Sequence, residues 1–299
     1  MPATYPKRVE ICEVGPRDGF QFEKRDISTS LKLEIIENLI EAGLSRIQIA
    51  SFVHPKWVPQ MADAEKIVAA FSDRNDCILS ALALNEKGVR RALDAHVHQI
   101  DLSIATNEIH SMANANMSVA DGVASAMHMI RMVIESGGRP QIGLQTVFGY
   151  ANPGDTSPDL VLELVAKFCE LDIESISLAD STGMANPALV SEVLERVQAV
   201  TAGTPIVLHL HDTRGLGLAN VTAALQSGID RFDTSFGGLG GCPFIPGATG
   251  NIATEDTAYL CECLGIKTGI NLEKVSRISK DYEEFRGSQL SGKMYRLLS

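Results

Sequence analysis

The sequence predicts one α/β barrel in which eight parallel strands alternate with eight helices. Short β-like runs alternate with helical patterns along the chain, and such alternation indicates a parallel sheet. Eight repeats within 299 residues suit a closed (β/α)₈ barrel, which typically takes about 250 residues. An open doubly wound sheet is the alternative. No long Gly/Ser/Pro-rich linker interrupts the repeats, so we expect a single domain over residues 1–299.

The order of the runs places each element. The expected strands are 8–14, 46–51, 77–82, 99–105, 141–148, 175–179, 205–211 and 231–236. The expected helices are 28–42, 61–71, 85–95, 118–136, 158–172, 186–200, 217–228 and 251–264. The region from about 270 to 299 is more charged. We expect it to form a C-terminal helical appendage that packs on the barrel.

Composition excludes several classes of protein. A net charge of −11 argues against a nucleic-acid partner, although an arginine or a metal can still attract an anionic substrate into one cleft. The six cysteines have irregular spacings without a CxxC pair, so neither a disulfide framework nor a zinc ribbon is expected. No signal peptide and no apolar run of about 18 residues stands out, which predicts a cytoplasmic protein without a membrane partner.

Polar residues gather at the expected ends of the first and seventh strands, where barrel enzymes carry their catalytic groups. Arg17 and Asp18 follow the first strand in a turn framed by Gly and Pro. His209 and His211 end the seventh strand and, two residues apart, point to the same face. Two neighbouring imidazoles at a barrel mouth could share a metal ion. The competing interpretation is a solvated turn and a solvated strand end.

A glycine-rich loop follows the eighth strand and ends at Asn251. Such a loop can approach a ligand closely, whereas a phosphate cradle is less favoured because the GxxxxGK[ST] pattern is absent. Cys242 lies in this loop, which makes it a candidate for acid/base or covalent chemistry. Asn251 has two competing interpretations, as a metal ligand and as the N-cap of the last barrel helix.

Five segments together resemble the 3-hydroxy-3-methylglutaryl-CoA (HMG-CoA) lyases of the metal-dependent DRE-TIM family. They are EVGPRDGFQ at 13–21, SFVHPKWVPQMAD at 51–63, SLADSTG at 177–183, HLHDTRGLGLAN at 209–220 and GLGGCPFIPGATGNIATED at 238–256. They occur in order over nearly the whole chain. The resemblance implies a metal bound by Asp18, His209, His211 and Asn251. This ligand set suits Mg²⁺ or Mn²⁺ and leaves Zn²⁺ or Co²⁺ open.

The resemblance also implies a reaction: cleavage of HMG-CoA to acetyl-CoA and acetoacetate, a step of leucine degradation. Arg17 would stabilise the charge on the thioester oxygen, and Cys242 would protonate the enolate. Asp180 and Glu13 would transfer protons or orient a ligand. Relatives are often homo-oligomers. The residues implied near the acyl-CoA substrate are Gln21, Gln48, Ser51 and Gly241.

Two departures from the family pattern concern the acyl group. Gln48 stands where the lyases have a Glu, and 145–150 replace a loop that contains Cys and Gly. Asp101 and Ser103, on one face of the fourth strand, match no known role. A different hydroxy-acid or acyl-CoA substrate is therefore a second interpretation. A Claisen-type synthase, an aldolase that releases pyruvate and a non-catalytic acyl-CoA binder are three more.

Overall fold

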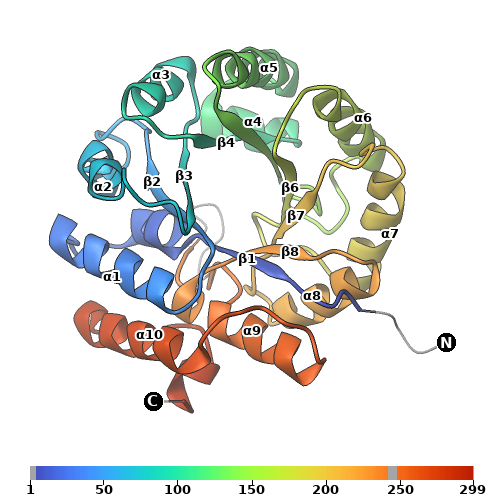
Figure 1. The fold of residues 1–299 in the computed structure, drawn as a ribbon. Helices are drawn as coiled ribbons and strands as arrows, with labels where there is room; N and C mark the ends of the chain where they lie inside the picture. Colours follow the sequence, from blue (N-terminus) through green and yellow to red (C-terminus); the bar gives the residue numbers. More distant parts are fainter. Residues whose placement is uncertain (1–4, 242–247, 299) are drawn as a thin grey trace.

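The residues described by this computed structural model, 5–241 and 248–298, form a closed barrel of eight parallel strands surrounded by helices (Figure 1). The strands follow one another around the barrel in chain order, and β8 closes it by pairing with β1. The predicted (β/α)₈ barrel is thus confirmed. The strands are β1 Glu10–Glu13, β2 Arg46–Ser51, β3 Ile78–Leu82, β4 Gln99–Ala105, β5 Arg139–Gln145, β6 Ser175–Ala179, β7 Ile206–His209 and β8 Arg231–Thr234.

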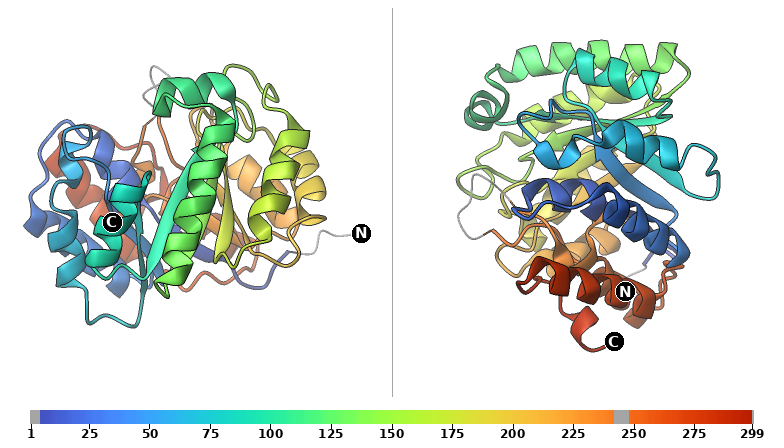
Figure 2. Two further views of the ribbon diagram at one scale, coloured as in Figure 1. Left: turned by 90° about the horizontal axis from the view of Figure 1, so that it is seen from above. Right: turned by 90° about the vertical axis from the view of Figure 1, so that its left-hand side faces the viewer.

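The helices lie on the outside of this sheet in both views of Figure 2. Many of them begin after a Ser or Asn whose side chain accepts a backbone hydrogen bond from the first turn, as Ser28 does before α1 and Asn186 before α7. The helices are α1 Thr29–Glu41, α2 Ala64–Ala70, α3 Glu86–Asp94, α4 Glu108–Ala115, α5 Val119–Glu135, α6 Pro158–Cys169, α7 Pro187–Gln198, α8 Gly217–Gln226, α9 Thr254–Cys263 and α10 Leu272–Arg286.

Three expectations about elements need correction. The fifth strand ends at Gln145 rather than at 148, because Thr146 adopts a left-handed φ of 59° that stops an extended strand. The additional helix α4 follows β4, capped by Asn107. The last barrel helix begins at Thr254 after Ala253 rather than at 251, which excludes the N-cap, the competing interpretation of Asn251.

Charged side chains fill the N-terminal end of the barrel, where the strands begin. Arg46 contacts the carboxylate of Glu174 at 3.0 Å and that of Glu10 at 3.4 Å. Arg231 approaches the same two carboxylates, and Arg139 pairs with Glu174. This cluster of five residues, called the basal ion cluster below, lies at the end of the barrel opposite to the strand ends that carry the candidate site.

The C-terminal helix α10 packs beside α1 and against the turns that follow β1 and β8 (Figure 1). Its Tyr282 ring lies 5.4 Å from the rings of both Phe20 and Phe236. Beyond this helix, Gly292 donates a backbone hydrogen bond to Gly237. The C-terminal region therefore supports the two turns next to the candidate site. That residues 1–299 form a single domain with an appendage remains a prediction.

Among the described residues, no helix is both long enough and apolar enough to cross a membrane.

Candidate metal and active site

Arg17 and Asp18 lie in a single π-helical turn, Gly15–Gly19, directly after β1. Gly15 has no space for a side chain, since a Cβ there would lie 2.6 Å from the carboxylate of Glu13 and 2.7 Å from the ring of Phe236. This tight packing directs the buried Asp18 toward the barrel mouth. Arg17 Nη1 lies 2.5 Å from Asp18 Oδ1. Burial raises the pKa of Asp18, but Arg17, the two histidines and the hydrogen bond from Asn251 together lower it below its ordinary value, which favours the ionised carboxylate.

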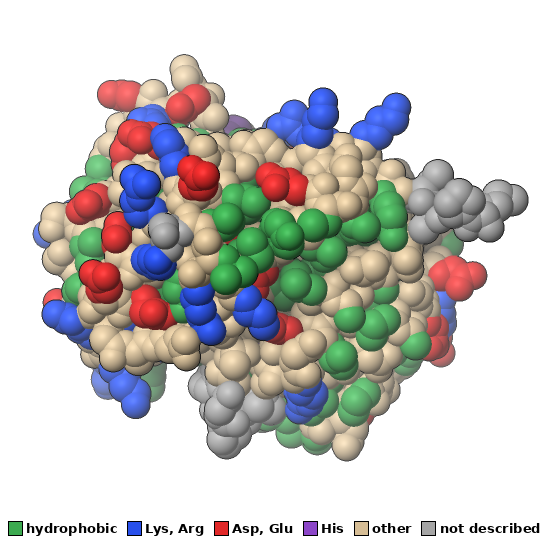
Figure 3. All heavy atoms as spheres, turned by 90° about the horizontal axis from the view of Figure 1, so that it is seen from below, with side chains coloured by type: hydrophobic (Ala, Val, Ile, Leu, Met, Phe, Trp, Pro, Cys, Tyr) green, Lys and Arg blue, Asp and Glu red, His purple; other side chains and the backbone are tan. Residues whose placement is uncertain are grey.

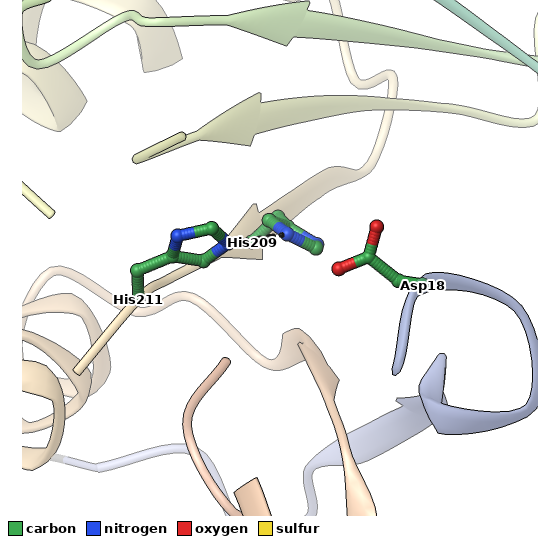
Figure 4. Close-up of side chains that lie close together, drawn as sticks. All are labelled: Asp18, His209 and His211. Atoms are coloured by element: carbon green, nitrogen blue, oxygen red, sulfur yellow. Dashed lines mark hydrogen bonds between the residues drawn. The ribbon is translucent and has the colours of Figure 1, made fainter. Parts of the chain in front are cut away.

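His209 and His211 project together, as their spacing predicts. Their Nε2 atoms lie 3.3 Å apart, and Figure 4 shows the two rings side by side with the Asp18 carboxylate directed toward His209. One ligand atom from each of the three residues lies within 4.8 Å of the others. Burial and the neighbouring His209 lower the pKa of His211 to about 3. Its ring is therefore neutral, as a metal-binding imidazole must be.

Asn251 completes this group from the far end of the chain. Its backbone forms an isolated bridge with His211, and its Nδ2 donates to Asp18 Oδ2 at 2.8 Å and to the carbonyl of Leu239 at 3.1 Å. Its Oδ1 is buried and has no hydrogen-bond partner among the described residues. An unpaired buried amide oxygen is costly unless a ligand satisfies it. This oxygen therefore fits a metal ligand.

A carboxylate that the sequence did not reveal orients His209. Asp233 on β8 lies 3.3 Å from His209 Nδ1, and Ser177 Oγ donates to the same Asp233 oxygen at 3.5 Å. Burial lowers the pKa of His209, but the carboxylates of Asp233 and Asp18 together raise it above its ordinary value. A carboxylate on the outer nitrogen of a metal-binding histidine fixes the tautomer and the direction of the other nitrogen. The only sequence signal was an acidic residue inside a strand.

These donors fit a divalent cation. Asp18, His209 and His211 place their ligand atoms within 4.8 Å of one another, and Asn251 is hydrogen-bonded to Asp18 beside them. One carboxylate, two imidazoles and one amide oxygen form a set that Mg²⁺, Mn²⁺, Zn²⁺ and Co²⁺ all accept. A cation held by these residues would give the buried Asn251 oxygen the partner that it lacks among the described residues.

Glu13 and Asp180 are both buried but have different contacts. The Glu13 carboxylate accepts from the backbone of Gly15 at 2.7 Å and from the hydroxyl of Thr254 at 2.6 Å, so it joins the ends of β1 and α9. These contacts are those of a positioning group. Asp180 Oδ1 accepts from the backbone N–H groups of Met184 and Ala185, whereas its Oδ2 has no hydrogen-bond partner among the described residues. Burial raises the pKa of Asp180 to about 6, which suits proton transfer.

Gln48 lies beside Arg17, as the sequence resemblance implied for a site residue. Arg17 Nε donates to Gln48 Oε1, and Gln48 Nε2 donates in turn to Asp101 Oδ2 on β4. Ser80 Oγ donates to the same Asp101 oxygen at 2.6 Å. The unassigned Asp101 therefore belongs to the surroundings of Arg17.

The remaining predicted residues differ in how far the structure describes them. Gln21 Nε2 donates to Asp18 Oδ1 at 3.0 Å. Ser51 is fully buried at the end of β2, where its hydroxyl accepts from the backbone of Val53. A Cβ on Gly241 would lie 3.5 Å from the Phe22 ring, so Gly241 packs next to the turn after β1. Cys242 lies outside the described residues.

At the end of β5, where the sequence departs from the family pattern, Gln145 lies near the barrel mouth. Gln145 Oε1 is held by His110 Nε2 at 3.0 Å and by Asn114 Nδ2 at 3.4 Å, both from α4. The fully buried Thr146 has a left-handed backbone, which is rare for a β-branched residue. Strained residues of this kind gather at functional sites. The altered segment is visible in the sequence, whereas its partners on α4 are not.

Comparisons with known proteins agree on one family. The family model described as HMGL-like matches residues 8–281. The hydroxymethylglutaryl-CoA lyase of Bacillus subtilis is 40% identical over 290 residues, which cover 96% of each chain. The crystal structure of a B. subtilis HMG-CoA lyase superposes with a TM-score of 0.94 at 39% identity and covers 99% of both chains.

A third match was solved with ligands. The structure of an HMG-CoA lyase from Acinetobacter baumannii, in complex with coenzyme A and 3-methylmalate, superposes with a TM-score of 0.91 at 36% identity. It covers 97% of this chain and 95% of that one.

Proposed function

Because the chain belongs to the HMGL-like family, we propose that it is a divalent-metal-dependent carbon–carbon lyase that cleaves HMG-CoA to acetyl-CoA and acetoacetate. The observation that carries the proposal is the convergence of Asp18, His209 and His211 at the ends of the barrel strands, with Asn251 hydrogen-bonded to Asp18 beside them. A chain that only bound an acyl-CoA would not need such a ligand set.

The residues around this site suit a retro-Claisen cleavage. A divalent cation held by Asp18, His209, His211 and Asn251 would supply the Lewis acidity that makes the tertiary hydroxyl of the substrate acidic. Asp180, with an unpaired Oδ2 and a pKa of about 6, is ionised at neutral pH and able to accept a proton. It is our candidate for the base.

Two further residues would act on the thioester half of the substrate. Arg17 keeps its positive charge at any physiological pH and can stabilise the negative charge that develops on the thioester oxygen. We assign protonation of the enolate carbon to Cys242, in the glycine-rich loop. We assign substrate contacts to Gln21, Gln48, Ser51 and Gly241, and a positioning or proton-transfer role to Glu13.

The proposal is tested with purified protein, HMG-CoA and Mg²⁺ or Mn²⁺. We expect acetoacetate to form, as followed by a coupled NADH-dependent dehydrogenase, and EDTA to abolish its formation until metal is restored. Absence of acetoacetate from folded, metal-loaded protein would contradict the HMG-CoA assignment. The comparison of the two metals also addresses which of them the site prefers.

A different hydroxyacyl-CoA is the second candidate substrate. The polar Gln48 and Gln145, with its partners on α4, favour it, because they change the hydrogen-bonding groups near the expected acyl position. The A. baumannii relative was solved with 3-methylmalate, a hydroxy diacid. A panel of 3-hydroxyacyl-CoA esters, ranked by kcat/KM, distinguishes the two candidates: the preferred substrate has the highest value.

Assembly and location remain predictions. The face seen from below carries a band of hydrophobic side chains between more charged regions (Figure 3). We keep the expectation of a homo-oligomer, which light scattering would test. A cytoplasmic location and a role in leucine degradation are proposed from the family alone.

A further inference from the structure

A chain of side-chain hydrogen bonds leads from Arg17 across three neighbouring strands. Arg17 Nε donates to Gln48 on β2, and Gln48 Nε2 donates to Asp101 on β4. Between them, Ser80 on β3 pairs in register with Gln48 and donates to the same carboxylate at 2.6 Å. Because the Ser80 side chain is small, Gln48 reaches past β3 to a carboxylate two strands away.

The chemistry at both ends of Gln48 requires an amide in the middle. A guanidinium has only donors and an ionised carboxylate has only acceptors, so Gln48 must offer its oxygen to Arg17 and its nitrogen to Asp101. A glutamate at this position would bring two carboxylates into contact. Gln48 and Asp101 are each only 4% exposed, so water would screen little of that repulsion.

We propose that Asp101 is a positioning residue for the lyase reaction, which holds the Arg17 guanidinium through Gln48. This inference rests on the proposed function. Asp18 holds Nη1 of Arg17 and Gln48 holds Nε, so the guanidinium is fixed at two of its three nitrogens. Neither contact uses Nη2, which is the nitrogen we assign to the thioester oxygen. Asp101 is the buried acceptor at the end of this chain; burial raises the pKa of its carboxyl, and the hydrogen bonds from Ser80 and Gln48 favour its charged form.

A cycle of three variants tests the role of Asp101. Gln48→Glu places two carboxylates together and thereby displaces Arg17 from the charge that develops on the thioester oxygen. We therefore expect kcat for HMG-CoA cleavage to fall about 10- to 100-fold while KM changes little. Asp101→Asn alone keeps an acceptor for Gln48 but loses the charge, and kcat falls less. In the double variant Gln48→Glu/Asp101→Asn the new carboxylate accepts from Arg17 and from the new amide, so most of kcat returns.

Gln60→Glu is the matched control, because Gln60 is also buried but binds backbone carbonyls of the 23–25 segment outside the barrel interior. We expect it to lower the melting temperature and to leave kcat unchanged. Wild-type kcat in Gln48→Glu, or a double variant no better than Gln48→Glu, would overturn the proposal.

A second measurement separates this inference from the proposed function. If the wild-type protein did not cleave HMG-CoA, the proposed function and the positioning role of Asp101 in that reaction would both be wrong. The melting temperatures of the same cycle still test the pairing: Gln48→Glu should lower the value and the double variant should restore it. No restoration would overturn the Gln48–Asp101 pairing itself.

Discussion

His209 shows how a single residue at the site depends on a neighbour outside it. Its Nε2 faces His211, and the direction of that nitrogen is set by the contact of its Nδ1 with Asp233. Asp233 also receives Ser177, which limits the rotation of the carboxylate. Metal affinity should therefore depend on a residue that need not touch the metal.

We predict that Asp233→Asn weakens metal binding about 10- to 100-fold, because the histidine loses the carboxylate that sets its tautomer and basicity. Titration of Mn²⁺ by calorimetry measures the change. Asp230→Asn, on the exposed turn before β8, is the control and should bind Mn²⁺ like the wild type. Equal affinity in both variants would show that Asp233 does not orient His209.

At the residue scale, the sequence predicts the relative orientation of side chains that are close together along the chain. The separation of two residues brought His209 and His211 to one face, and the structure confirms it. The partners of Gln48 and His209 could not be found in this way. Asp101 and Asp233 reach them from other strands, so their roles depend on the register of the barrel, which one sequence without relatives does not specify.

Among the elements, the segment between β8 and α9 positions Asn251 by close backbone packing. Gly250 has a left-handed φ of 90°, and a Cβ there would lie 2.5 Å from the carbonyl carbon of Gly240. A side chain at this position would therefore push apart two backbone segments that flank Asn251.

We expect Gly250→Ala to cost about 1–3 kcal/mol of unfolding free energy and to weaken Mn²⁺ binding, because both the backbone and Asn251 must move. Urea unfolding and metal titration measure the two effects. Gly228→Ala is the matched control: its φ of 82° is also left-handed, but a Cβ there would meet nothing within 4 Å. Gly228→Ala should lose stability without losing metal affinity. A loss of metal affinity in both variants would refute the explanation that the packing of Gly250 positions Asn251.

Glu255 links α9 to the turn after β8 and makes stability depend on pH. Its carboxylate accepts from the backbone of Gly237 at 3.0 Å and from Ser279 at 2.9 Å. Burial raises the pKa of Glu255 to about 7, well above its value in an unfolded chain. The folded state therefore disfavours the charged form. The contribution of Glu255 to stability is complete below about pH 4.5 and declines as the pH rises to about 7.

Glu255→Gln should remove this decline, which is on the order of 3 kcal/mol at 1.36 kcal/mol for each unit of pKa. The test is urea unfolding of both proteins at several values between pH 4.5 and pH 8. Glu284→Gln, on the exposed face of α10, should keep the wild-type pH dependence. If the Glu255→Gln and wild-type curves ran parallel, the buried carboxylate would not be the cause.

The alternation of strands and helices was predictable, and β2, β4 and β6 have the predicted bounds. The errors fall where local geometry overrides the pattern. The apolar run after Gln145 has the composition of a strand, yet the left-handed Thr146 ends β5. Helix α4, capped by Asn107, was not among the predicted elements, because its 8 residues are too few for a clear apolar period.

On the scale of the whole molecule, the basal ion cluster and the candidate site lie at opposite ends of the barrel. The basal ion cluster closes the end where the strands begin, and Glu174 contacts three of its arginines. We predict that Glu174→Gln costs about 1–3 kcal/mol of unfolding free energy, because the buried Arg46 then keeps only the Glu10 carboxylate as its charged partner. Urea unfolding measures the loss, and kcat at 25 °C should not change.

The exposed pair of Glu86 and Arg90 on α3 provides the comparison. Glu86→Gln should leave the unfolding free energy almost unchanged, since water screens the pair. Similar losses in the two variants would mean that the basal ion cluster contributes no more than a surface pair.

The proposed metal ligands come from both ends of the chain: Asp18 follows β1, and Asn251 follows β8. The pairing of β1 with β8 closes the barrel, so the ligand set is complete only after the barrel has closed. A ribosome must release almost the entire chain before a cation can be captured. Binding then adds its free energy to the closed ring alone and not to any open intermediate. A bound metal would thus indicate that the barrel has closed. Removal of the metal by a chelator should destabilise the pairing of β1 with β8 before that of the other strand pairs.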